Sequence, residues 1–491
     1  MKPQDRLGIG VLVGCVLAAA ALRVYQLDFQ SLWIDELFSV VFSGPDQSIS
    51  EIVAAWANDV HPLGYPLLLH AWLGVFGDTP AAARWLSVVF GVLGVAAMYV
   101  VGRRCFDART GVIASVLTAV NAFHIAYSQE ARAYSLVFLL AALSYTSFVT
   151  VLAWPGWRTA VVFALATAAS IHVHYYGLVV LFGQLVAALS IVAFKRWRWG
   201  RVWPLLAGAA AAGLTLVPWI GPLARVAKIR DAWPARPEPL FFVEYFDGYF
   251  GGEPLLSIAS ATLLAALPFL LGARPEGDGG SRRLPQRTTA CLFAAAVVIS
   301  LAAAYARSVL VVPMLVPKVT IAFLPVVLLL IALAISRIRP EWLGSVVAAG
   351  LALASLAALF TGDYYFAPHK EQWREAVRSM VSDPAFHPET DVCLGVSAPG
   401  FQYYVDQYGT SVRVEEANAE MLAEIVADRP EPPSVWVLVA RDEDSVRGLR
   451  RTLRGGWART DRKVFLETSV ERWEPVQKDE RDADLIEGTE R

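Results

Sequence analysis

Residues 159–194 read TAVVFALATAASIHVHYYGLVVLFGQLVAALSIVAF, 36 positions without a Lys, Arg, Asp or Glu. Arg158 precedes the stretch and Lys195 follows it. A helix rises about 1.5 Å per residue, so about 20 residues cross a bilayer core of roughly 30 Å. The stretch therefore has room for two membrane spans. Because Lys and Arg concentrate in cytoplasmic loops, its polar centre, IHVHYYG (171–177), is predicted to turn at the outer face.

Similar apolar runs of roughly 16–22 residues recur from Leu7 to Phe360, each long enough or nearly so to cross a bilayer. Of the 491 residues 56% are hydrophobic and 18% charged, which excludes a disordered chain and argues against an ordinary soluble one. The net charge of −2 points to no nucleic-acid partner. No small-residue cleavage site ends the first run, so it is interpreted as a retained anchor. The four cysteines are scattered and imply neither a disulfide framework nor a zinc site.

Six short basic clusters divide the apolar runs, and placing all six in the cytoplasm predicts eleven spans. If residues 62–77 crossed the whole membrane, the orientation of every later span would be reversed. They are therefore predicted to form a short helix at the outer interface, although a re-entrant pair of helices also fits. The last span exports everything after Thr361. The segments then predicted at the outer face are 28–80, 127–134, 171–177, 221–253 and 308–318.

The composition becomes polar after Asp363, and strand-like runs alternate with helical ones. The fold class predicted is an α-helical polytopic membrane protein with a small C-terminal extracytoplasmic α/β domain. Its parts are a transmembrane domain (1–361) with an acidic first loop (28–80), the α/β domain (362–475) and a disordered acidic tail (476–491). Residues 463–475 are predicted to close the sheet.

Two acidic groups stand out in the first loop, which has seven acids and no Lys or Arg. In SLWIDELFSV (31–40), Asp35 and Glu36 lie among apolar residues, and adjacent helical positions point about 100° apart, so the two need not share one task. An interfacial helix with its acids in water is the alternative. In DVHP (59–62), Asp59 and His61 suit a divalent cation such as Mn²⁺ or Zn²⁺, or else simply begin a helix.

Further polar groups fall at the predicted outer face. Glu130, Arg132 and Tyr134 lie where a span meets that face, and Arg can hold a phosphate through two parallel hydrogen bonds. A structural Glu/Arg pair is as good an interpretation. His174 and Tyr175 crowd the outer turn at 171–177, where an aromatic belt is the alternative. Lys318 adds a cation on the exported side, against the prevailing bias.

Taken together, these stretches resemble bacterial glycosyltransferase family 39-like proteins, a group of the GT-C fold that includes protein O-mannosyltransferases and the lipid A aminoarabinose transferase. The resemblance covers roughly residues 7–340. It is carried by six segments in order: SLWIDELFS, DVHPLGYPLLLHAW, RWLSVVFGVLGVAAMYVVGRR, AYSQEARAYSL, HVHYYGL and VPMLVPKVTIAFLPVVLLLIAL.

The resemblance implies a hexosyl- or pentosyltransferase of the bacterial plasma membrane that uses a polyprenyl-phosphate sugar at the outer leaflet. The acceptor would be a lipid, a glycan or a protein. A carboxylate base fits that chemistry, with a divalent cation (Mn, Mg or Zn) and no organic cofactor. The roles implied are catalytic for Asp35 and Glu36; metal-binding for Asp59, His61 and His174; and donor phosphate-binding for Glu130, Arg132, Tyr134, Tyr175 and Lys318.

Two positions depart from the family pattern. Leu63 follows Pro62 where the family usually has a second proline, and Lys318-Val319 stands where many members have Arg-Tyr. Lys keeps the charge but loses the planar fork of Arg. A lipid or sugar transporter without transferase activity is the competing function. It predicts ionisable residues near the middle of the bilayer, whereas here they gather at the outer boundary.

Overall fold

The computed structural model describes residues 3–57, 59–194, 197–228, 235–272, 283–427, 434–441 and 446–476. These residues form two compact units, Met1–Leu27 with Phe42–Tyr365, and Asp28–Val41 with Phe366–Arg491. We call the first the helical unit and the second the sheet unit. The predicted disordered tail lies outside the described residues, apart from its first position. So do several basic residues used to predict the topology (Lys2, Lys195, Arg196, Arg274 and Arg282).

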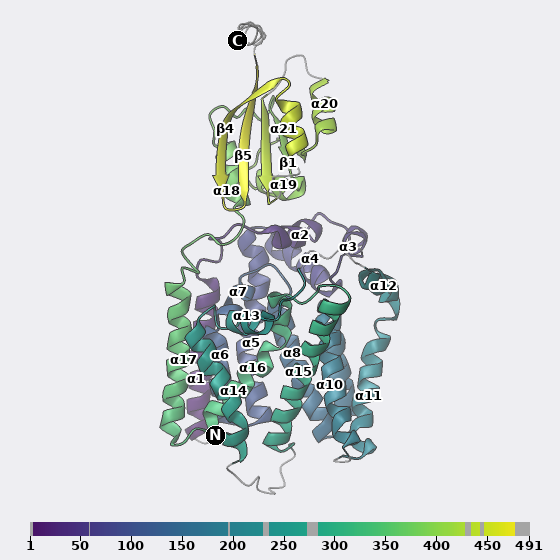
Figure 1. The fold of residues 1–491 in the computed structure, drawn as a ribbon, viewed down its shortest axis with the longest axis vertical. Helices are drawn as coiled ribbons and strands as arrows, with labels where there is room; N and C mark the ends of the chain where they lie inside the picture. The colour runs from purple at the N-terminus through teal and green to yellow at the C-terminus, as the bar shows by residue number, and fades with distance from the viewer. Residues whose placement is uncertain are drawn as a thin grey trace. The chain divides into compact units, whose positions relative to one another are not determined.

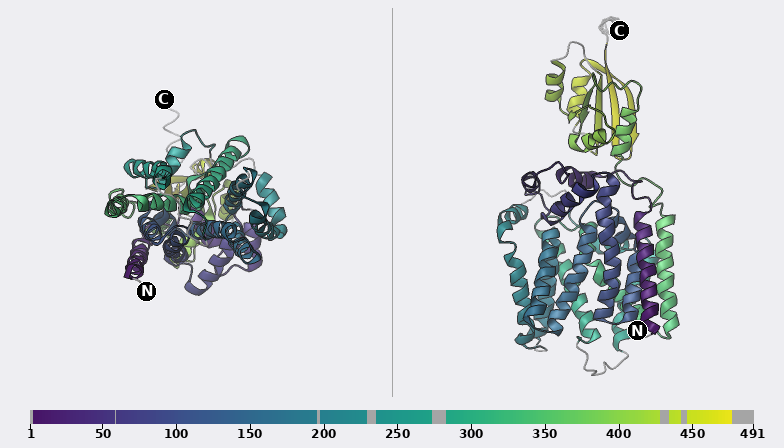
Figure 2. Two further views of the ribbon diagram at one scale, coloured as in Figure 1. Left: turned by 90° about the horizontal axis from the view of Figure 1, so that it is seen from below. Right: turned by 180° about the vertical axis from the view of Figure 1, so that it is seen from behind.

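The helical unit is built from helices that run side by side (Figures 1 and 2). Its helices in chain order are α1 (Pro3–Val24), α3 (Ile49–Trp56), α4 (Gly64–Phe76), α5 (Pro80–Cys105), α6 (Ala108–Val120), α7 (Ala122–Ser128), α8 (Tyr134–Ala153), α9 (Trp157–Val173), α10 (Tyr176–Ala193), α11 (Trp199–Leu214), η1 (Val217–Trp219), α12 (Ile220–Lys228), α13 (Phe241–Gly248), α14 (Pro254–Gly272), α15 (Gln286–Leu310), η2 (Pro317–Ala322), α16 (Leu324–Arg337) and α17 (Glu341–Thr361).

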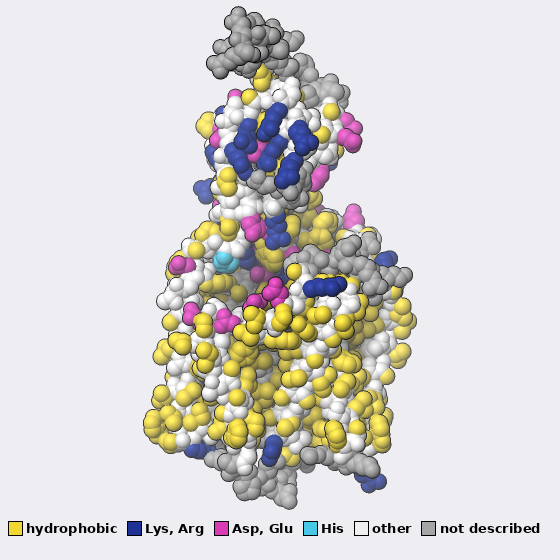
Figure 3. Space-filling view, in the orientation of Figure 1, with side chains coloured by type: hydrophobic (Ala, Val, Ile, Leu, Met, Phe, Trp, Pro, Cys, Tyr) yellow, Lys and Arg dark blue, Asp and Glu magenta, His cyan; other side chains and the backbone are white. Residues whose placement is uncertain are grey.

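The chain is a multi-pass membrane protein. Among the described residues, six helices are long and apolar enough to cross a membrane, or up to eight if each of two bent helix pairs is one span. On the face that Figure 3 shows, apolar side chains cover most of the surface of this unit. Four shorter apolar helices accompany them: Gly8–Val24, Gly64–Phe76, Trp157–Val173 and Leu324–Arg337.

Local signals explain where the helices begin. Thr79 caps α5 by accepting a hydrogen bond from the backbone of Ala82, and Pro80 occupies the first turn, where its missing N–H is not needed. Asp107 caps α6 in the same way through the backbone of Thr110. The centre of the unit is α16, in which every residue from Leu324 to Ser336 is buried. An apolar helix surrounded by other helices on all sides is the expected centre of such a bundle.

Arg23 is fully buried at the end of α1, beside the 61° bend between α6 and α7. Its guanidinium donates to the carbonyl oxygens of Thr118 (3.2 Å) and Ala119 (3.0 Å) in the last turn of α6, where the regular helical hydrogen bonds end. The positive charge also suits the negative end of the α6 dipole. Arg23 therefore stabilises the bend that leads the chain into α7 and the loop after it.

The sheet unit has five strands in the order β2-β1-β3-β5-β4. β1 is parallel to β2 and β3, and β5 is antiparallel to β3 and β4. The strands are β1 (Val392–Gly395), β2 (Val414–Glu416), β3 (Val435–Ala440), β4 (Trp457–Phe465) and β5 (Thr468–Pro475), and the helices are α2 (Ile34–Phe42), α18 (Trp373–Val381), α19 (Ala398–Gln407), α20 (Ala419–Ala427) and α21 (Arg447–Leu453). This confirms the predicted small C-terminal α/β region. The segment 463–475 contributes to two strands rather than one, because the chain turns at Leu466–Glu467.

Candidate functional site

A small cavity in the helical unit, here called the His61 cavity, brings together motifs that are far apart in the sequence. It is lined by Trp56, His61, Pro62, Tyr65, Pro66, Arg132, Ala133, Tyr134, Val173 and His174. These residues come from the loop before α4, the loop before α8 and the turn between α9 and α10. The cavity has a volume of about 10 Å³, room for about one water molecule. It therefore has to widen before it can admit a sugar phosphate.

Asp59, His61 and Arg132 form a connected chain of hydrogen bonds. Oδ1 of Asp59 lies 2.6 Å from Nδ1 of His61 and also accepts the backbone N–H of His61 at 2.8 Å. Nη2 of Arg132 lies 3.1 Å from Nε2 of His61. A guanidinium only donates, so Nε2 must accept and Nδ1 carries the proton toward Asp59. His61 is thus a neutral imidazole that links a carboxylate to the guanidinium of Arg132.

The surroundings of Asp59 in this hydrogen-bonded group favour its charged form. Burial alone would raise the pKa of the Asp59 carboxyl, but its hydrogen bonds to His61 and the nearby charge of Arg132 outweigh burial and hold the pKa below its ordinary value. Arg132 is itself only 5% exposed. Its carbonyl oxygen accepts a hydrogen bond from the hydroxyl of Ser87 at 3.0 Å. This hydrogen bond holds the backbone of Arg132, and the contact with His61 holds its guanidinium at the cavity wall.

His174 faces the same cavity and is buried, with 6% of its surface exposed. Its Nδ1 accepts the backbone N–H of Tyr176 at 3.1 Å, so its Nε2 carries the proton. Among the described residues, Nε2 has no hydrogen-bond partner. Burial, and then the positive charges of Arg132 and Lys318, hold the pKa of His174 well below its ordinary value. His174 is therefore a neutral N–H donor whose natural partner is an acceptor in the cavity.

The other predicted phosphate-site residues lie around the same place. Tyr134 is buried and lines the cavity, and its ring centroid lies 6.3 Å from that of His174. Burial and the negative charge of Asp59 raise the pKa of Tyr175. Lys318, at the start of η2, contributes to the field at His174. Glu130 is also buried, two residues before Arg132.

A close contact between backbones shapes the cavity. A Cβ added at Gly64 would lie 2.3 Å from the carbonyl oxygen of His172, so only glycine lets the start of α4 approach the end of α9 this closely. This approach brings His61, three residues before Gly64, toward His174, two residues after His172. The two imidazole centroids are 5.4 Å apart.

The donor set does not fit the metal ion predicted for Asp59, His61 and His174. Both ring nitrogens of His61 have protein partners, and one of these partners is the positive guanidinium of Arg132. Nδ1 of His174 is also taken, by a backbone N–H. Among the described residues no group of three or more His, Cys, Asp and Glu side chains is placed to hold a metal. The arrangement instead suits an anion, since Arg132 and His174 both offer N–H groups.

Asp35 and Glu36 belong to the sheet unit, whereas the cavity belongs to the helical unit. Glu36 is fully buried, and its Oε2 lies 3.0 Å from Nζ of Lys370. Asp35, on the adjacent face of α2, is partly exposed. The two acids therefore differ in surroundings, as their 100° separation on a helix leads one to expect. That Asp35 joins the residues of the His61 cavity stays a prediction.

Residues of the C-terminal segment hold the start of α2 in place. The carboxylate of Glu371 accepts the backbone N–H of Ile34 at 2.9 Å, and the hydroxyl oxygen of Tyr404 accepts that of Leu32 at 2.7 Å. The N–H of Ile34 belongs to the first turn of α2, where it has no helical partner, and the N–H of Leu32 lies two residues before the helix. The sequence analysis missed Lys370, Glu371 and Tyr404, and it also missed Trp56 and Tyr65 of the cavity.

Comparison with known proteins places these observations in a family context. Residues 60–221 match the model of the family described as "Dolichyl-phosphate-mannose-protein mannosyltransferase". This match contains His61, Arg132, Tyr134 and His174 but not Asp35. No curated protein sequence matches the chain significantly.

Solved structures show the same fold at low sequence identity. ArnT from Cupriavidus metallidurans bound to undecaprenyl phosphate superposes with a TM-score of 0.63 at 14% identity, over 94% of this chain and 98% of that one. The archaeal oligosaccharyltransferase AglB from Archaeoglobus fulgidus, in complex with an inhibitory peptide and a dolichol-phosphate, gives a TM-score of 0.51 at 12% identity, over 98% of this chain and 75% of that one. The predicted resemblance to GT-C membrane glycosyltransferases is thereby confirmed.

Proposed function

We propose that the chain is a membrane glycosyltransferase that moves a sugar from a polyprenyl-phosphate donor to an acceptor hydroxyl at the extracytoplasmic face. The observation that carries the proposal is the His61 cavity, where Arg132 and the N–H of His174 converge in a setting fit for a phosphate. The match of residues 60–221 to a mannosyltransferase family supports the reaction class. ArnT, which has the same fold, binds undecaprenyl phosphate, and this supports a donor of that type.

The membrane topology proposed has eleven spans. Both bent helix pairs and three of the shorter apolar helices, α1, α9 and α16, then cross the bilayer in addition to the six long helices. The 13-residue α4 lies at the outer interface. With the basic loops in the cytoplasm, the His61 cavity and the C-terminal segment are extracytoplasmic, in the plasma membrane of a bacterium.

Arg132 is proposed to bind the donor phosphate, with Lys318 adding positive charge and His174 donating a hydrogen bond. His61 positions Arg132: it accepts one guanidinium N–H and is itself oriented by Asp59. Charge-assisted hydrogen bonds of this kind become more effective as negative charge grows on a leaving phosphate. The proposed task of the cavity is therefore to stabilise the polyprenyl phosphate as it leaves.

Asp35 is proposed as the general base, and Glu36 as its support. Glu36 is buried and paired with Lys370, which suits a residue that holds the helix, whereas Asp35 is partly exposed. In the reaction, the acceptor oxygen forms a bond to the anomeric carbon while the bond from that carbon to the phosphate oxygen breaks. The hydroxyl proton passes to the carboxylate of Asp35, and the electron pair leaves with the phosphate. A single in-line displacement of this kind inverts the anomeric carbon.

The test measures transfer of radiolabelled sugar from a polyprenyl phosphate in membranes that contain the full chain. A hexosyl donor (mannose) and a pentosyl donor (arabinose) are both supplied, and the native membranes provide the acceptor. Asp35→Asn is expected to lower turnover by about 100-fold or more while donor binding persists, since a general base contributes roughly 10²–10⁴. Arg132→Gln is expected to weaken donor binding itself.

Matched controls are available in the same regions. Asp46→Asn changes an exposed acid of the first loop, and Arg236→Gln changes an exposed arginine of the outer face. Both are expected to keep wild-type turnover. Equal turnover in wild type and a well-folded Asp35→Asn variant would remove Asp35 as the base. No transfer from either donor by the wild-type chain would overturn the proposed function.

A further inference from the structure

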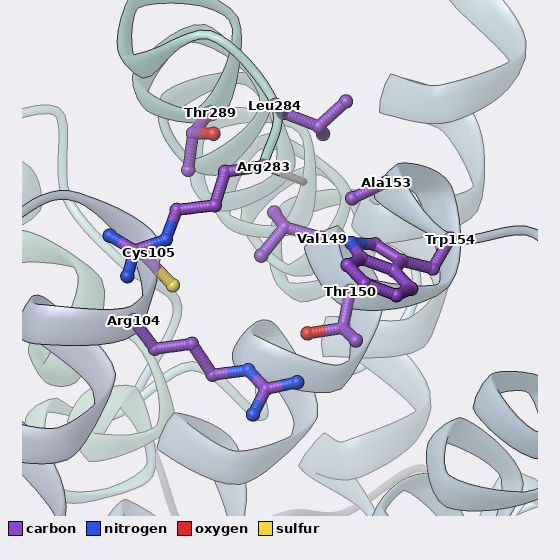
Figure 4. A pocket seen from close by; sticks show the side chains of 9 residues that line it. All are labelled: Arg104, Cys105, Val149, Thr150, Ala153, Trp154, Arg283, Leu284 and Thr289. Carbon is purple, nitrogen blue, oxygen red and sulfur yellow. The ribbon is translucent and has the colours of Figure 1, made fainter. Parts of the chain in front are cut away.

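A second cavity lies in the helical unit, far from the His61 cavity. It is formed where α5 and α8 end and α15 begins, and Figure 4 shows its lining. Trp154, which lines it, follows the last residue of α8, whereas Tyr134 of the His61 cavity is the first residue of that helix. A helix of 20 residues is about 30 Å long, so the two cavities lie at opposite ends of α8. The volume of the second cavity is about 280 Å³, enough for a phosphate and a small organic group.

Two arginines give this cavity its charge. Arg104 is the penultimate residue of α5, and Arg283 precedes α15; no Asp or Glu is among the described residues that line the cavity. Nη1 of Arg283 donates to the carbonyl oxygens of Arg103 and Phe106, both at 3.1 Å, so this guanidinium is fixed at the wall. The nearby carboxylate of Asp107 is paired with Arg337 at 2.6 Å and is not the counter-ion. Both arginines are also exposed, so the cavity opens to solvent as a positively charged site that can pair with an anion.

The rest of the lining is apolar and lies at a membrane boundary. Val149 and Leu284 contribute hydrocarbon surface, and Figure 4 shows the Trp154 ring across from Arg283. Trp154 is 43% exposed and Trp157, three residues on, is 69% exposed. Tryptophans at span ends mark the interface between hydrocarbon and headgroups. A phosphate in this cavity would thus lie at headgroup depth, with hydrocarbon surface beside it.

We propose that this cavity, the Arg104 cavity, binds the phosphate of an anionic phospholipid in the leaflet opposite the His61 cavity. Basic pockets between spans on the side of the Lys/Arg-rich loops recognise such headgroups. A free phosphate ester would satisfy the arginines equally, but it would leave the apolar lining and the interfacial tryptophans without a role. The proposal does not depend on the transferase reaction.

The test is native mass spectrometry of the full chain in detergent, titrated separately with phosphatidylglycerol, phosphatidylcholine and glycerol phosphate. Wild type is expected to retain phosphatidylglycerol over phosphatidylcholine and to bind glycerol phosphate weakly. Arg104→Gln removes one charged donor and is expected to weaken phosphatidylglycerol binding about tenfold or more. No hydrogen bond or ion pair joins Arg104 to another described residue, so the variant is expected to fold normally.

Arg158→Gln is the matched control. Arg158 is an exposed arginine that contacts the Trp157 ring and does not line the cavity. The Arg158→Gln variant is expected to bind phosphatidylglycerol as tightly as the wild-type chain does. Unchanged binding by Arg104→Gln, or an equal loss in Arg158→Gln, overturns the site. Binding of glycerol phosphate as tight as that of the lipid overturns the lipid as its ligand, and equal retention of phosphatidylcholine overturns the requirement for an anion.

Discussion

Nζ of Lys370 lies 3.0 Å from Oε2 of Glu36, joining residues 334 positions apart in the sequence. Both side chains are largely buried, with exposures of 10% and 0%. A buried charge requires a partner, since desolvation otherwise disfavours it strongly. This pair therefore ties the acidic helix α2 to the C-terminal segment, and with it the partly exposed Asp35.

Lys370→Met is expected to destabilise the sheet unit by about 3 kcal/mol, because it leaves the carboxylate of Glu36 buried without its cation. The measurement is thermal unfolding of the full chain, read by proteolytic cleavage of the sheet unit. The double variant Glu36→Gln/Lys370→Met should recover part of the loss, because no buried charge is then left unpaired. A double variant no more stable than Lys370→Met would contradict the pairing.

Gly64→Ala is expected to separate α4 from α9, since its Cβ would lie 2.3 Å from the His172 carbonyl oxygen. Overpacking of this kind costs about 1–3 kcal/mol and should also lower sugar transfer, because His61 lies only three residues before Gly64 and would be displaced with the start of α4. Gly74→Ala, in the same helix, has open space at its Cβ and serves as the control. It is expected to leave transfer unchanged and to stabilise the helix by up to about 1 kcal/mol. Equal effects of the two substitutions would refute the close-approach argument.

His174 predicts a pH dependence of stability. Its pKa in the folded chain lies well below the ordinary 6.5, so below pH 6.5 the unfolded chain binds the proton first. The stabilisation is fully present above pH 6.5 and is lost progressively as the pH falls toward the folded pKa. His174→Gln should flatten this part of the stability profile, measured by thermal unfolding between pH 7.5 and pH 5. The exposed His387→Gln should leave it unchanged, and an unchanged profile in His174→Gln would rule out this histidine as the cause.

Glu471 lies in the sheet unit at 0% exposure and contacts three arginines, Arg450 at 2.9 Å, Arg459 at 3.1 Å and Arg462 at 3.4 Å. Figure 3 shows basic side chains gathered on a face of this unit. Glu471→Gln is expected to cost about 2 kcal/mol, since the arginines lose their shared anion but are partly solvated. Glu474→Gln, on the same strand, removes a 42% exposed acid and should cost less than about 1 kcal/mol. Urea unfolding of the sheet unit compares them, and similar losses would contradict the central role of Glu471.

Much of the fold could be predicted because apolar runs and basic loops obey simple rules. The alternation of basic clusters and spans placed Arg132 and His174 at the same end of the bundle, and the structure brings both to one cavity. The loop before α4 joins them because Gly64 permits close packing, which hydropathy alone does not encode. The metal ion could not be tested from sequence, since it depends on which atoms of His61 already have partners.

The sheet unit was harder to predict in detail. The turn between β4 and β5 is formed by Leu466 and Glu467, and Glu467 adopts φ 52° without the Gly or Asn that usually marks such a turn. The pairing of Glu36 with Lys370 was not predictable either, because periodicity describes neighbours along an element and not contacts 334 residues apart.

The sheet unit is assembled from two separate parts of the chain, residues 28–41 and the segment after Tyr365. During synthesis, Glu36 leaves the ribosome 334 residues before Lys370, a delay of roughly 20 to 60 seconds at ordinary elongation rates. The membrane spans between these two residues are therefore synthesised before Lys370 is available to pair with Glu36 of α2. A polypeptide that terminates before residue 370 can therefore never form this pair, so the pairing of Glu36 reports that translation has passed Lys370.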